Sequence, residues 1–65
     1  MKLETRVNKI IEGYTNKPSV TILDRQIHLT GGAWSARQDV EDYFAQKGVV
    51  SCVSNKKDSK VIELD

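Results

Sequence analysis

The stretch Gln26-Ile-His-Leu-Thr-Gly-Gly-Ala-Trp-Ser35 decides the predicted fold. Residues 26–30 alternate between polar and apolar side chains, which is the pattern of a β-strand. Gly31 and Gly32 follow, and two glycines allow a strand to turn sharply into a helix. A cluster of backbone amides at such a junction is also able to hold an anion. The stretch therefore predicts a strand–turn–helix junction whose turn is either purely structural or an anion site.

The segment after this junction carries strong helix signals. Ser35 with Gln38 three residues later predicts a capping box, and Gly48 is placed as a residue that ends a helix. We therefore predict a helix from Ala36 to Lys47. Its apolar face is made of Ala36, Val40, Tyr43, Phe44 and the stem of Lys47.

The N-terminal segment predicts a second, amphipathic helix within residues 1–15. Its apolar residues recur at helical spacing, and Pro18 lies beyond its end. The apolar stripe needs a surface to cover, either the sheet of the same chain or a partner. The stripe consists of Leu3, Val7, Ile10, Ile11 and Tyr14.

Three further segments have the character of strands. Residues 19–23 alternate, and they either pair with residues 26–30 through a turn at Asp24-Arg25 or form an extended lead-in to the sheet. Residues 49–53 and 60–64 flank a polar turn at 54–59. A helix between two strands predicts a right-handed crossover in a parallel sheet. We therefore expect one small α/β domain over residues 1–65, with two helices and a mostly parallel sheet of three or four strands.

Composition excludes several classes of protein. The 65 residues include ten basic and nine acidic ones, which excludes a protein that coats nucleic acid by charge alone but leaves room for a local basic patch. A single cysteine, Cys52, excludes an internal disulfide framework. No apolar run approaches the roughly 20 residues of a membrane span. We therefore predict a cytoplasmic protein that has no membrane partner.

Residues suited to catalysis are sparse. His28 is the one histidine, and no nucleophile motif, metal-ligand cluster or phosphate-binding loop of nucleotide hydrolases accompanies it. We predict that the chain is not an enzyme, with no catalytic residue, metal ligand or cofactor. Trp34 stands before the second helix, either as a lid over the sheet end or as a surface for a base or a partner.

Four short motifs resemble the first half of a BRCT domain in order and spacing. They are Ile27-His-Leu-Thr-Gly31, the helix start at Ser35-Ala-Arg37, the glycine and valine-rich strand at 48–53, and the turn Ser54-Asn-Lys-Lys-Asp58. The resemblance spans residues 23–64. The later helices of that family, with their tryptophan and pocket lysine, have no counterpart here.

The resemblance implies a fold and a site. Thr30 and Gly31 match the phosphate-contacting pair of the family, and Lys56 and Lys57 match its basic turn. It implies a non-catalytic binding module that binds DNA ends, phosphate groups or a protein partner in replication or repair, in the nucleoid or nucleus. The predicted phosphate- or nucleic-acid-binding residues are Thr30, Gly31, Gly32, Ser35, Arg37, Lys56 and Lys57.

An alternative function remains open from the sequence. A small sheet with a bare edge strand invites pairing with a second copy, so we also expect a homo-oligomer. In that case the chain is a homodimerising interaction or regulatory protein with no phosphate binding. An RNA-binding module of the RRM type has the same order of elements, but its strands carry aromatic residues that this chain lacks.

Overall fold

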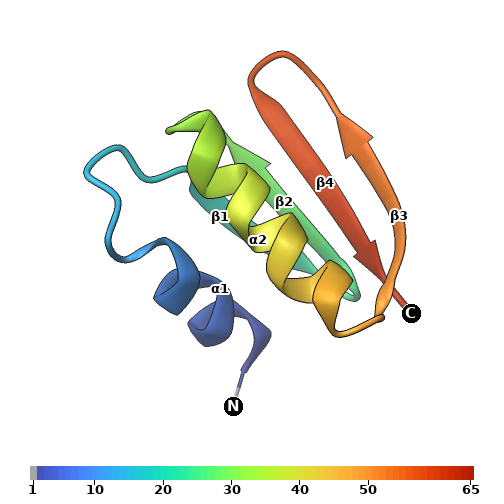
Figure 1. The fold of residues 1–65 in the computed structure, drawn as a ribbon. Coiled ribbons are helices and arrows are strands. Elements are labelled where there is room, and N and C mark those ends of the chain that lie inside the picture. Colours follow the sequence, from blue (N-terminus) through green and yellow to red (C-terminus); the bar gives the residue numbers. More distant parts are fainter. Residues whose placement is uncertain (1) are drawn as a thin grey trace.

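The computed structural model describes residues 2–65 and places both helices on one face of a four-stranded sheet (Figure 1). The two helices contact each other, and α1 also packs against the first strand. The elements in chain order are α1 (Leu3–Ile11), β1 (Ser19–Leu23), β2 (Gln26–Thr30), α2 (Trp34–Gln46), β3 (Val50–Asn55) and β4 (Ser59–Leu64).

The sheet is antiparallel, so the predicted mostly parallel sheet is wrong. The strand order is β1-β2-β4-β3, and every neighbouring pair is antiparallel. A crossover through α2 does exist, because β2 and β3 run in the same direction. However, the chain turns back after β3, and β4 inserts between these two strands (Figure 1). The turn at residues 56–58 therefore converts an expected parallel pair into two antiparallel pairs.

The hairpin of β1 and β2 resolves an alternative that the sequence left open. Leu23 pairs with Gln26 and Ile22 with Ile27, so residues 19–23 belong to the sheet. The loop consists of Asp24 and Arg25 alone. Asp24 has a φ of 56°, the left-handed conformation that tight hairpin loops require and that aspartate tolerates better than most residues. An aspartate thus takes a position at which two-residue hairpin loops favour glycine.

The core lies between the helices and one face of the sheet. Because side chains alternate along a strand, β2 and β4 present Ile27, Leu29 and Ile62 to the helices. The helices contribute the rest of the buried apolar cluster, which confirms that the stripe of α1 covers its own sheet. These residues are Val7, Ile11, Ala36, Val40 and Phe44.

One cation shares this inner face. Lys60 of β4 is only 2% exposed, and its Nζ lies 2.5 Å from Oε1 of Glu41 on α2. A buried ammonium is costly unless a carboxylate compensates it. Lys60 therefore ties the middle of α2 to the sheet through a compensated ion pair.

The predicted capping box of α2 is also wrong. The helix begins at Trp34, its N-cap residue is Ala33, and no side chain caps it. Ser35 consequently lies inside the first turn, and Gln38 donates a hydrogen bond to Asp42 at 3.0 Å. Within residues 2–65, neither helix is long and apolar enough to cross a membrane.

Candidate functional site

The diglycine turn contacts two segments that are far from it in the sequence. The amide of Gly31 donates to the carbonyl of Asp58 at 2.6 Å, which connects the turn to the β3–β4 hairpin. The amide of Ala33 donates to the carbonyl of Asn16 at 2.8 Å, which connects it to the α1–β1 loop. We call the surface formed by residues 16–18, 30–35 and 56–58 the diglycine end. It lies at one end of the sheet, where α2 begins (Figure 1).

Gly32 is required for packing within this junction. Its φ of 67° is a left-handed conformation, and a Cβ there would lie 2.3 Å from the nitrogen of Pro18 and 2.6 Å from the carbonyl carbon of Lys17. Gly31 has a similar φ of 70°, but a Cβ at this position would meet nothing within 4 Å. The close approach of two backbones thus makes Gly32 a structural residue.

Arg37 holds the same turn from inside. Its side chain is 6% exposed, and its Nη1 donates to the carbonyls of Gly31 and Gly32, the latter at 3.0 Å. The one ion pair within residues 2–65 is that of Lys60 and Glu41, so carbonyl dipoles rather than a carboxylate satisfy this guanidinium. Arg37 therefore fixes the turn and is turned away from solvent.

These contacts occupy groups that the sequence predicted to bind phosphate. The Gly31 amide already donates to Asp58, and the Arg37 guanidinium already binds the turn. Two of the predicted phosphate donors, the Gly31 amide and the Arg37 guanidinium, are thus engaged within the protein. Thr30 and Ser35 are exposed at the surface of the diglycine end.

The predicted basic turn does lie at this end. Thr30 pairs with Ser59 in the sheet, and the Lys56 amide donates to the carbonyl of Ser59 at 2.8 Å. The side chains of Lys56 and Lys57 are exposed. The structure therefore places Thr30 and the two lysines at one end of the sheet, although it withdraws Arg37 into the interior.

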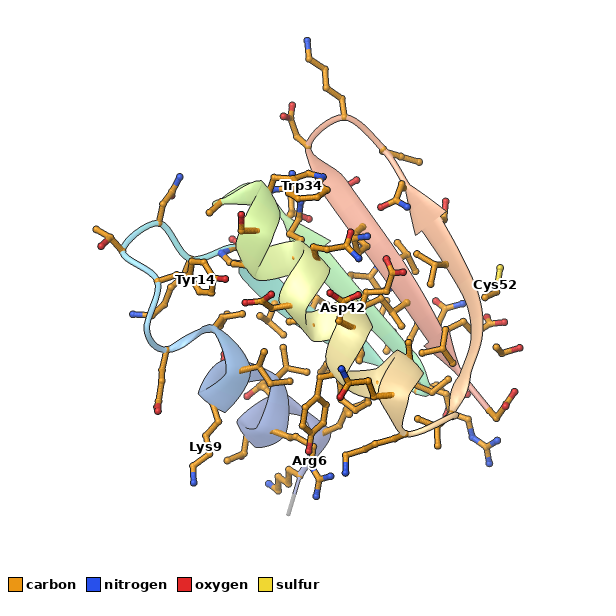
Figure 2. All side chains as sticks on the ribbon, viewed as in Figure 1. Arg6, Lys9, Tyr14, Trp34, Asp42 and Cys52 are labelled. Carbon is orange, nitrogen blue, oxygen red and sulfur yellow. The ribbon has the colours of Figure 1, made fainter. Side chains whose placement is uncertain are left out.

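Two further residues complete the surface. Trp34 is 65% exposed at the start of α2, so it is no lid over the sheet (Figure 2). Lys17 is exposed in the α1–β1 loop, whose backbone packs directly against Gly32. Lys17 was missed because no local sequence pattern indicates that residues 16–18 meet the diglycine turn.

The face of the sheet opposite the helices carries a further small polar network. Gln26 donates to Glu63 at 2.9 Å, and the Nε2 of His28 lies 3.1 Å from the Oε1 of Gln26. His28 thus faces this polar network rather than a nucleophile. In the part of the chain that the structure describes, no cluster of three or more His, Cys, Asp or Glu side chains is placed to hold a metal ion.

Comparison with known proteins adds no relative. No family model, no curated protein and no solved structure matches this chain. The BRCT-like motifs are assembled here into an antiparallel sheet, in place of the parallel one that the resemblance implied. The surface residues themselves are therefore the basis of the functional proposal.

Proposed function

We propose that this chain is a non-catalytic binding module that contacts single-stranded nucleic acid, foremost DNA, through the diglycine end. The observation that carries the proposal is the exposure of Trp34, at 65%, on the same end of the sheet as Lys56 and Lys57. A base stacked on an aromatic side chain contributes about 1–3 kcal/mol and needs no particular sequence. The neighbouring lysines supply cations for the phosphates.

The chemistry of the surface favours nucleic acid over protein. Lysine is depleted at the centre of protein interfaces, whereas phosphate backbones are bound mainly by lysine and arginine. Three exposed lysines, Lys17, Lys56 and Lys57, belong to the diglycine end. Three phosphate contacts correspond to a slope of about −2 in a plot of log affinity against log salt. We therefore expect weak, strongly salt-dependent binding. A place in DNA replication or repair stays a prediction, because it rests on the resemblance alone.

The decisive variant is Trp34→Ala. Binding of a fluorescein-labelled oligothymidine, followed by fluorescence anisotropy, is expected to weaken about tenfold or more because the stacking surface is lost. Leu23→Ala is the matched control, since Leu23 is also an exposed apolar residue, at 54%, but lies in the hairpin at the other end of β1. Equal binding by the two variants would contradict the proposal.

Two further measurements locate the phosphates. Replacing both Lys56 and Lys57 with glutamine is expected to make the salt slope shallower by about 1.4. An oligonucleotide with a 5′-phosphate should bind no more tightly than one without it, because Arg37 and the Gly31 amide are engaged in the fold. A strong preference for the 5′-phosphate would instead favour binding of DNA ends.

Self-association is the second candidate function, and one feature favours it. Strand β1 is an uncovered edge of the sheet, with Leu23 exposed at its end. Sedimentation velocity over a wide range of protein concentration tests this candidate. A dimer that Leu23→Asp dissociates would support it, and a monomer at every concentration would exclude it.

A further inference from the structure

A second surface lies away from the diglycine end, between the two helices. Arg6, Lys9 and Ile10 of α1 and Tyr43 of α2 line an open groove of about 340 Å³, which we call the helix groove. Figure 2 shows Arg6 and Lys9 at the opposite end of the helical layer from Trp34. The volume is within the range of sites that take small ligands or a few side chains.

The helix groove is basic and has an apolar floor. Nη1 of Arg6 donates to the hydroxyl of Tyr43 at 3.3 Å, and Nζ of Lys47 lies 5.0 Å from the centre of the Tyr43 ring. Lys9 adds a third cation, and the half-buried Ile10 contributes apolar surface to the lining.

These cations lack compensation from carboxylates. No acidic side chain lines the groove. Across residues 2–65 the one ion pair within 4.0 Å joins Lys60 to Glu41, so Arg6, Lys9 and Lys47 each stand without a carboxylate partner. A concentration of unpaired positive charge around an apolar floor is complementary to a ligand that is acidic and partly apolar.

We propose that the helix groove binds an acidic peptide segment of a partner protein, in which a carboxylate side chain neighbours an apolar one. Arg6 is suited to a carboxylate because guanidinium and carboxylate groups pair through two parallel hydrogen bonds. Ile10 and the Tyr43 ring offer the contact for the apolar neighbour. The groove shares no residue with the diglycine end, so this proposal stands apart from nucleic-acid binding.

The surroundings favour a peptide over a nucleic acid strand. On α2, the exposed acidic residues Asp39 and Asp42 precede Tyr43 and lie between the groove and Trp34. A continuous strand would carry its regularly spaced phosphates past these carboxylates, and like charges repel. A peptide needs negative charge only at the positions that face Arg6 and Lys9.

Nuclear magnetic resonance of the ¹⁵N-labelled full chain tests the proposal directly. The probe is a synthetic peptide of alternating glutamate and leucine, and the control probe is its lysine–leucine counterpart. We expect amide shifts confined to α1 and the C-terminal half of α2 with the acidic peptide only. The double variant Arg6→Glu, Lys9→Glu should bind at least about tenfold more weakly, because charge-assisted hydrogen bonds are lost. Lys57→Glu should bind as the parent does, because Lys57 lies at the diglycine end.

Several outcomes would overturn the proposal. Shifts centred outside the groove, or equal binding of both peptides, would reject it, as would unchanged binding by the double variant. If oligothymidine produced the same groove shifts, and the double variant abolished those shifts, nucleic acid would be the occupant of the groove. If the charge reversal perturbs folding, Arg6→Gln with Lys9→Gln tests the same contacts, and its fold is checked by urea denaturation. Because Trp34→Ala leaves the groove intact, failure of nucleic-acid binding and failure of peptide binding are separately visible.

Discussion

One arginine holds the turn of the diglycine end from inside and another lines the helix groove, and the two side chains have opposite surroundings. Arg37 is 6% exposed, and its guanidinium holds the carbonyls of Gly31 and Gly32. Arg6 is half-buried, and its side-chain hydrogen bond goes to the hydroxyl of Tyr43. An arginine whose donors are used inside the fold serves stability, whereas one with free donors at a groove is available to a ligand. Burial and partners, rather than residue type, thus separate the two roles.

The largest effect is expected for Gly32→Ala at the diglycine end. A methyl group there would lie 2.3 Å from the Pro18 nitrogen, so the backbone of residues 16–18 would have to move. The left-handed φ adds strain for any residue with a Cβ. We expect a loss of about 3 kcal/mol or more in the free energy of unfolding. Urea denaturation followed by circular dichroism measures this loss.

Gly31→Ala is the matched control for this change. Gly31 has nearly the same φ, yet its Cβ would meet open space. The expected loss is therefore only the conformational strain, about 1 kcal/mol. If the two alanine variants lost equal stability, the close approach at Gly32 would not govern the junction.

The next effect compares the two arginines directly. Arg37→Met keeps much of the side-chain volume but removes the donors from two carbonyls, and we expect a loss of about 2–3 kcal/mol in the free energy of unfolding. Arg6→Met changes a half-buried surface position, and we expect its effect to stay within about 0.5 kcal/mol. The same urea experiment applies to both. A comparable loss in the two variants would contradict the division into structural and available arginines.

Local patterns predicted the helices and strands because alternation and helical spacing depend only on residues that are close together in the sequence. The stripe of α1, the strands and the existence of α2 all follow from such spacing. The sheet order did not follow, because it depends on which strand enters between β2 and β3. The residues around Gly48 carry no signal that the chain will turn back at residues 56–58. They also carry no signal that β4 will lie between β2 and β3. The same sequence pattern of strand, helix, strand and strand fits two sheets. In one, β2 and β3 are parallel neighbours, and in the other β4 lies between them.

The candidate site was predictable in part for the same reason. Thr30 and Lys56–Lys57 were selected from local motifs, and the pairing of β2 with β4 brings them to one end. Arg37 carried a ligand role in the prediction, but its place on the inner side of α2 directs it into the turn. The backbone of Lys17 approaches Gly32, which is fifteen residues away in the sequence, and no periodic pattern predicts such a contact.

The smallest expected effect concerns Tyr14, a residue of the α1–β1 loop that contacts α2. Its hydroxyl donates a hydrogen bond to Oδ2 of Asp39. That hydrogen bond raises the pKa of Tyr14 above its ordinary value near 10, and desolvation and the charge of Asp39 act in the same direction. The cause is that ionisation would place a phenolate against a carboxylate. Asp39→Asn should therefore lower the pKa of Tyr14 toward its ordinary value.

The sign of the effect on stability follows from this raised pKa. A group whose pKa is higher in the folded state than in the unfolded state stabilises the fold fully below its unfolded pKa, here about pH 10. The contribution is lost as the pH rises through the folded pKa. The stability difference between the parent and Tyr14→Phe should consequently be present at neutral pH and shrink above about pH 10. Urea denaturation of the parent and of Tyr14→Phe, at neutral pH and above about pH 10, measures this difference in the free energy of unfolding. Ultraviolet titration of Tyr14→Phe gives the signal of Tyr43 alone, so that the Tyr14 titration in the parent can be assigned. A difference that grew with rising pH would show that the Tyr14–Asp39 hydrogen bond does not hold the loop to α2.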